Sequence, residues 1–163
     1  MNTFGRSWLG WALAGLCLSV PGLSHAQAEG GLQVTTAVYQ DVQVPAADGG
    51  TETKRVAATT VVPGTEVIYE ISFHNATKVA ATDIAINNPV PKELVFTGVD
   101  GIPATAVSVD DGSHYGALPE LTVAADNGAT RPARPEDVTN LRWIVANLAA
   151  GAQGSVSYRA RVK

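Results

Sequence analysis

Two segments of the chain alternate between apolar and polar residues, which is the pattern of a strand with one buried face. In Glu66–Asn75 an apolar side chain occupies nearly every second position, and the opposite face is polar apart from Ile68. The segment 156–162 repeats the pattern, with serine and arginine at the alternate positions. A period of two with β-branched and aromatic residues on one face predicts antiparallel strands with one solvated side.

Shorter apolar or alternating segments lie between turn signals and predict further strands. Their ranges are 32–44, 56–62, 82–87, Leu94–Val99 and a strand carrying Leu141, Trp143 and Val145. A weaker alternation of Val107 with Val109 predicts another short strand, with residues 121–124 as its partner.

Glycine, proline and asparagine punctuate these segments at positions where the backbone must turn. Pro63-Gly64 fits the central pair of a type II turn, because proline fixes φ near −65° and glycine tolerates positive φ. Asn127-Gly128, preceded by an aspartate, suits a type I′ hairpin turn. Pro135 is expected to begin a single helical turn.

These elements predict an all-β fold, an immunoglobulin-like antiparallel β-sandwich of about seven to nine strands. No amphipathic helical run follows the first 28 residues. We expect one domain over residues 29–163, which is long enough to bury a stable core without covalent crosslinks.

The first residues have the order of a secretory signal peptide. Arg6 precedes an apolar run over 8–20, and Pro21-Gly22 ends it before a small-residue motif at 24–26. We expect a signal peptide over 1–26, with cleavage after Ala26 or Ala28; an uncleaved anchor is the alternative. Cys17, the single cysteine, lies in this run, and Leu16 before it disfavours lipid attachment. The mature chain therefore has no disulfide and no cysteine nucleophile.

The charge balance disfavours one class of partner. The chain has 11 basic and 15 acidic residues, and removing Arg6 with the leader makes the net charge −5. An acidic surface without a basic patch repels phosphate backbones, so we expect no nucleic acid partner. We also expect no cofactor and no membrane span in the mature chain.

The spacing of several residues resembles a known family. The succession is Pro63-Gly64, Val67-x-Tyr69-x-Ile71, Asn75, Ala80-Ala81, Pro91, Leu94, Phe96, Leu141-Arg142-Trp143, Leu148, Gly151 and Val156. It resembles the DUF11 conserved-repeat domain, which implies an immunoglobulin-type sandwich of bacterial and archaeal secreted or cell-surface proteins. Two departures are Asn87-Asn88-Pro89, where that family commonly has an acidic residue before Leu-Pro, and a single copy instead of an array.

The polar cluster around Asp110 and Asp111 is the candidate metal site. Closely spaced carboxylates in a glycine-bent loop suit calcium, although the spacing does not match an EF-hand. A solvated hairpin turn is the simpler alternative. His74 is expected on the outward face of its strand, and with His114 it lacks the context of a catalytic triad, so no catalytic residue is predicted.

Aromatic residues give the remaining site candidates. Trp143 is in phase with Leu141 and Val145 and is expected in the core, with a partner for its indole N–H. Tyr39 is out of phase with Val38 and Val42, and these three are the predicted interaction residues. The segment they belong to either pairs with the edge of a neighbouring subunit by strand addition or forms the first strand of its own domain.

The expected function is therefore that of a non-enzymatic, exported structural or protein-interaction module. It would act in the periplasm or outside the cell, with other envelope proteins or itself as partner, and strand edges are one route of assembly. A carbohydrate- or calcium-binding surface module is the alternative.

Overall fold

The computed structural model describes residues 31–125 and 128–163, so the predicted signal peptide, with Cys17, lies outside the described residues. The described residues form ten strands and two single-turn 3-10 helices, with no α-helix among them. None of their helices has the length and apolar character needed to cross a membrane. The prediction of an all-β antiparallel sandwich is confirmed, with ten strands in place of seven to nine.

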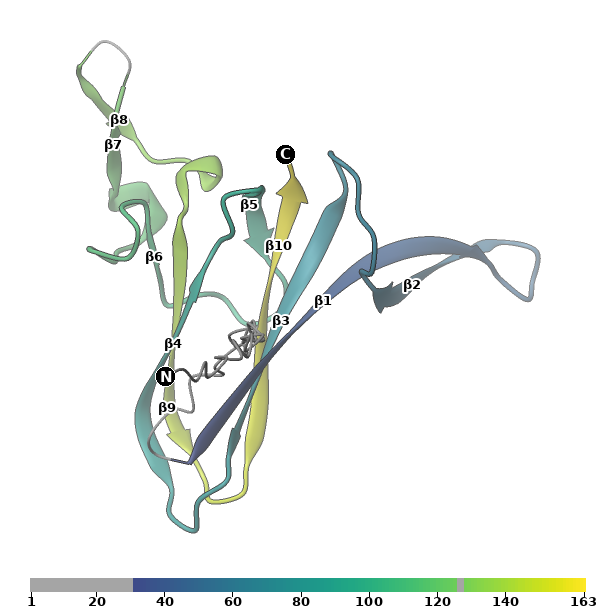
Figure 1. Cartoon of the computed structure of the whole chain (residues 1–163), viewed down its shortest axis with the longest axis horizontal. Helices are drawn as coiled ribbons and strands as arrows, with labels where there is room; N and C mark the ends of the chain where they lie inside the picture. Colours follow the sequence, from purple (N-terminus) through teal and green to yellow (C-terminus); the bar gives the residue numbers. More distant parts are fainter. Residues whose placement is uncertain (1–30, 126–127) are drawn as a thin grey trace, which may run out of the picture.

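Two antiparallel sheets form the body of the fold, and a hairpin extends from it (Figure 1). The larger sheet has the order β2 (Thr51–Ala57), β1 (Leu32–Pro45), β3 (Glu66–Asn75), β10 (Gln153–Val162) and β5 (Leu94–Val99). The smaller sheet has the order β4 (Ala81–Pro89), β9 (Asn140–Leu148) and β6 (Ala106–Ser108). The hairpin consists of β7 (Thr122–Ala124) and β8 (Thr130–Pro132), flanked by the 3-10 turns η1 (Leu118–Glu120) and η2 (Pro135–Asp137).

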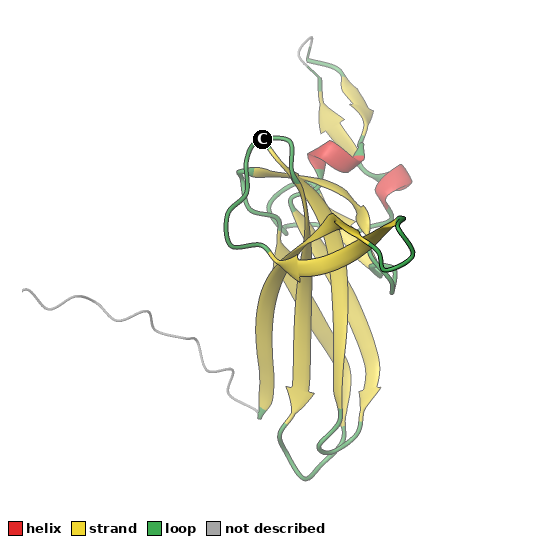
Figure 2. Ribbon diagram, turned by 90° about the vertical axis from the view of Figure 1, so that its right-hand side faces the viewer, coloured by secondary structure: helices red, strands yellow, loops and turns green. Residues whose placement is uncertain are grey.

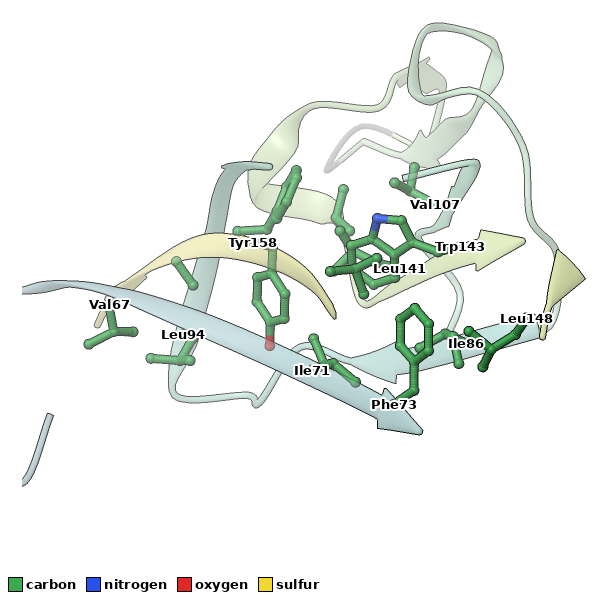
Figure 3. Packing of buried hydrophobic residues seen from close by; sticks show 14 residues of the cluster. Val67, Ile71, Phe73, Ile86, Leu94, Val107, Leu141, Trp143, Leu148 and Tyr158 are labelled. Atoms are coloured by element: carbon green, nitrogen blue, oxygen red, sulfur yellow. The ribbon is translucent and has the colours of Figure 1, made fainter. Parts of the chain in front are cut away.

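The core lies between the two sheets and follows the predicted alternation. Figure 3 shows Trp143 and Leu141 from β9 facing the β3 side chains, among them Ile71 and Phe73. Tyr158 of β10 is fully buried and stacks on Tyr69 with ring centroids 5.2 Å apart. The in-phase apolar residues of β3, β9 and β10 are therefore core residues, as predicted.

Two glycines are required by the backbone or by packing. Gly64 has φ +87°, and Thr65 N–H donates to Val62 C=O at 3.0 Å, which confirms the turn predicted at Pro63-Gly64. Gly154 faces Phe73 across β3 and β10, where an added Cβ would lie 2.7 Å from the phenyl ring. A side chain at position 154 would therefore displace the phenyl ring.

The second strand is the clearest wrong prediction. The sequence predicts it at 56–62, but β2 is Thr51–Ala57, and Val61 and Val62 are 39% and 64% exposed in the loop that follows. The strand pairs with the distal half of β1 in a two-stranded ribbon that projects from the body (Figure 1) and lies in front of it in Figure 2. Because such a ribbon buries little, its residues are polar, and apolar patterning does not reveal it.

The predicted pairing of the weaker strands is also wrong. Val107 lies in β6, which pairs with β9, and its N–H and C=O bond to Gly116. Residues 122–124 pair instead with 130–132, a local hairpin closed near Gly128. Closing this short loop costs less entropy than pairing with β6. The rest of the predicted Asp126-Asn127 turn lies outside the described residues, and the helical turn at Pro135 is confirmed as η2.

Candidate interaction surface

The strand β1 divides into two halves with different neighbours. Residues Leu32 to Tyr39 pair with β3, and residues Tyr39 to Pro45 pair with β2 on the opposite side. The first half therefore belongs to the body of the larger sheet, and the second half belongs to the projecting ribbon. This placement agrees with β1 being the first strand of its own domain.

The first half of β1 has one edge without a strand beside it, which we call the open edge (residues 32–37). Ala58 N–H donates to Val38 C=O at 2.9 Å, so the Val38 backbone points away from β3. Backbone groups alternate in direction along a strand, and Leu32, Val34 and Thr36 therefore point the same way. Within the described residues no strand pairs with this side of residues 32–37.

The open edge differs from the outer edge strands β2 and β4. The edge strand β2 carries Glu52, Lys54 and Arg55 among its seven residues, and charges discourage pairing with another chain. The edge strand β4 is interrupted at Asp83, whose φ of +53° is a left-handed conformation that breaks the extended ladder. Both are recognised ways of protecting a strand edge.

The outer strands β5 and β6 have other parts of the chain beside them. The turn η2 packs against β5, and the bridge from Val107 to Gly116 occupies the outer side of β6. The open edge of β1 has neither charge, interruption nor cover in the described part of the chain. Residues 153–156 of β10 and 145–148 of β9 also have no strand paired on one side within the described residues. The open edge of β1 is therefore one of the surfaces of this fold suited to accept another strand.

The three predicted interaction residues lie on different faces of β1. Val38 is partly buried and packs against the core, on the same face as Val34 by alternation. Val42 shares that face, but lies in the ribbon opposite Lys54. Tyr39 lies on the outer face of the sheet and is half-buried, so of the three only Tyr39 presents its side chain on the outer face.

The sequence analysis missed an ion network on the outer face of the larger sheet. The network comprises Asp41, Arg55, Glu66, Asp100 and Arg159. The Arg159 guanidinium contacts carboxylates of three of these residues at 2.9–3.2 Å, and Arg55 bridges Asp41 and Asp100 at 3.1 and 3.0 Å. It connects β1, β2, β3, β10 and the end of β5, and so fixes the ribbon to the body.

Ile68 explains why the network lies where it does. This residue is the one apolar position on the polar face of β3, yet it is only 1% exposed. In register it lies between Tyr39 and Arg159, whose side chains share its face. The methylene stem of an arginine covers apolar surface while its head stays charged. The sequence signal for this cluster is Ile68 itself, an apolar residue at a position that the alternation assigns to the polar face of the strand.

The electrostatics of the network favour its charged state. The hydrogen bond from Arg55 lowers the pKa of Asp41, and Arg159 adds to the shift. Hydrogen bonds to Glu66, Asp100 and Asp41 raise the pKa of Arg159. These side chains are 22–42% exposed, so solvent screens much of the attraction.

We expect Arg159→Met to lower the free energy of unfolding by about 1 kcal/mol, measured by urea denaturation. Methionine keeps an apolar stem over Ile68 and removes the ion pairs. Arg161→Met is the matched control, because Arg161 is an exposed residue two positions along the same face, and it should change stability by less than about 0.5 kcal/mol.

The same comparison has a defined pH dependence. Because the folded-state pKa of Asp41 is lowered, its contribution is complete above its unfolded-state pKa of about 3.9 and is lost as the pH falls through the folded-state pKa. The stability difference between wild type and Arg159→Met should therefore be constant from about pH 5 to pH 8 and shrink below about pH 4. A difference that persists undiminished at about pH 2 would contradict this electrostatic origin.

The Asp110 loop is occupied by its own hydrogen bonds. The Asp110 carboxylate accepts bonds from Ser108 Oγ at 2.7 Å and from His114 N at 2.9 Å, and its second oxygen lies 2.6 Å from His114 Nδ1. The backbone and ring bonds from His114, followed by that from Ser108, hold the pKa of Asp110 well below its usual range. Asp111 is exposed and donates its backbone N–H to Thr139 Oγ1.

This geometry fits a rigid turn in which the Asp110 carboxylate accepts hydrogen bonds from its own loop. In the described residues no group of three or more His, Cys, Asp or Glu side chains is arranged so that it could hold a metal ion. We therefore expect about 5 mM calcium to leave the melting temperature of the protein unchanged within about 1 °C, measured by differential scanning calorimetry. A calcium-dependent rise that Asp110→Asn abolishes would restore the metal-site interpretation, with magnesium as the control ion.

The two histidines lie in separate surroundings. His74 is half-buried on the outer face of β3, with Nδ1 3.4 Å from Gln33 Oε1. His114 is bound to Asp110 in its loop. Within the described chain neither imidazole is hydrogen-bonded to a hydroxyl group.

Comparisons with known proteins add no assignment: no family model, no curated protein and no solved structure matches this chain. The resemblance to the DUF11 conserved-repeat domain stays a prediction.

Proposed function

We propose that this chain is a non-catalytic, exported structural or protein-interaction module of the bacterial envelope or extracellular space, assembling through a strand edge. The observation that carries the proposal is the open edge of β1, a run of six uncharged residues in which Leu32, Val34 and Thr36 direct their backbone donors and acceptors away from β3. An added strand gains main-chain hydrogen bonds along such an edge, and side-chain contacts decide which strand is accepted.

The polar side chains of the fold support a structural role. Ser108, Asp110 and His114 hold one loop, and the five charged residues of the ion network hold the β1–β2 ribbon. These hydroxyl, imidazole and charged side chains therefore contribute to the structure of the domain. The leader-like first 28 residues support export, and the resemblance to a family of secreted sandwiches supports the same location.

Site-specific photocrosslinking in the native host tests this proposal. A photoreactive residue at Thr35, on the open edge, should capture a protein, and the same probe at Ser72, one strand inward, should capture far less. Fractionation and N-terminal sequencing of the same material should give a mature chain beginning at Gln27 or Glu29 outside the cytoplasm. Equal crosslinking at both positions, or an intact leader on cytoplasmic protein, would overturn the proposal.

A further inference from the structure

We propose that a hollow on the outer face of the larger sheet binds a neutral, unbranched oligosaccharide. The hollow crosses β1, β3 and β10, and we call it the trough. It is separate from the open edge, because strand addition uses backbone groups and the trough presents side chains. The inference therefore goes beyond the proposed function, and either one can fail without the other.

Strand register builds the trough from two rows of side chains. Thr35, Ser72 and Ser155 lie side by side in one row, and Gln33, His74 and Gln153 form the next. All six side chains lie on the outer face, because the residues that alternate with them on β3 and β10, such as Phe73, line the core. The hollow above them has a volume of about 470 Å³, within the range of small-molecule sites.

The side chains of the trough are hydrogen-bonding groups, and none is a carboxylate, an ammonium or a guanidinium. They supply three hydroxyls, two primary amides and one imidazole. His74 Nδ1 lies 3.4 Å from Gln33 Oε1. The other four side chains make no hydrogen bond to another residue in the described part of the chain. Their donors and acceptors are therefore available to a ligand.

This set of groups selects the chemistry of the ligand. A phosphate or carboxylate ligand requires lysine or arginine, and neither lines the trough. Glu70 lies two positions from Ser72 on the same face and adds a negative charge that disfavours anions. An apolar ligand would cover the donors and acceptors without pairing them. A sugar hydroxyl both donates and accepts, so it pairs with serine, threonine and glutamine side chains alike.

The ends of the trough favour the interior of a chain over a single sugar. Two strand spacings separate β1 from β10, about 10 Å in all. Beyond β1 is the open edge, and residues 153–156 of β10 have no strand paired on their far side within the described residues. An unbranched chain can therefore cross the sheet and continue past both edges.

A nuclear magnetic resonance titration of the full, ¹⁵N-labelled chain tests the site. The neutral probes are cellohexaose and maltohexaose, which differ in the linkage between their glucose units. At least one should shift the backbone amides of Ser72 and His74, with a dissociation constant on the order of 1 mM, because hydrogen bonds at an exposed site replace bonds to water. Hexagalacturonate, an acidic chain of the same length, should bind at least about tenfold more weakly.

A double variant removes two hydroxyls and leaves the strands intact. Thr35→Val with Ser155→Val should weaken binding at least about tenfold, since both side chains are exposed and valine suits a strand. Thr51→Val with Ser113→Val is the matched control, because it removes one threonine and one serine hydroxyl at exposed positions outside the trough. The control should leave the dissociation constant unchanged, and circular dichroism checks each fold.

Three results would overturn the inference. The first is that neither neutral probe shifts the Ser72 and His74 amides at about 20 mM, well above the expected dissociation constant. The second is that the double variant and its control bind equally well. The third is that hexagalacturonate binds more tightly than both neutral probes. None of these results bears on strand addition at the open edge, which photocrosslinking tests separately.

Discussion

Replacing Trp143 with alanine is expected to lower the free energy of unfolding by about 4 kcal/mol. The indole is 2% exposed in the core between β9 and β3, and its Nε1–H donates to Ile102 C=O at 3.1 Å. Truncation removes the largest core side chain, leaves a cavity and deprives that carbonyl of its donor. Because single domains have only about 5–15 kcal/mol of stability, this one change removes a large share.

Urea denaturation monitored by circular dichroism measures this loss, because the backbone signal does not depend on the removed indole. Ile144→Ala is the matched control: Ile144 is the next residue of β9, on the opposite face, and is 43% exposed. It should cost less than about 1 kcal/mol. A loss below about 1.5 kcal/mol for Trp143→Ala would show that the core packing described above is wrong.

Asn75→Ala is expected to cost about 3 kcal/mol, although asparagine is usually a surface residue. Its side chain is buried at the end of β3, where Nδ2 donates to Val79, Leu148 and Ala149 carbonyls at 2.8, 3.0 and 3.2 Å. Its Oδ1 accepts bonds from Thr77 N and Oγ1 at 3.1 and 2.7 Å. Alanine leaves these carbonyls and donors unpaired at the point where two loops meet.

Thermal unfolding in parallel with urea titration measures the Asn75 effect. Asn75→Asp should also be strongly destabilising, because a carboxylate cannot donate to the three carbonyls. Asn147→Ala is the control, since Asn147 is exposed near the end of β9 and should change stability by less than about 0.5 kcal/mol. If Asn75→Asp is as stable as the wild type, the donor role assigned to Nδ2 is wrong.

The strands with one dry face are the part of the fold that the sequence predicts well. The bounds of β3 and β5 agree with the predicted ranges, and Phe96 and Trp143 are core residues as expected. Alternation succeeds there because burial of one face forces a period of two. It fails at β2, where the ribbon buries little and the residues are polar.

The features of the candidate interaction surface, in contrast, could not be predicted from the sequence. The predicted residues Tyr39, Val38 and Val42 all lie in β1, but the feature that distinguishes this strand is its backbone edge, which involves no particular side chain. The ion network joins residues as far apart as Asp41 and Arg159, and only strand pairing brings them within 3.2 Å. Neither feature follows from the alternation of apolar and polar residues within one strand.

The sequence by itself determined the class of the fold, the buried and exposed faces of its main strands and the positions of several turns. These features depend on neighbouring residues and on the burial of one side of a strand. The tertiary structure alone decided which strand edge is left open and which charges meet, because both follow from the order of strands in the sheet. That order is a balance of long-range pairing and loop closure, which local alternation does not encode.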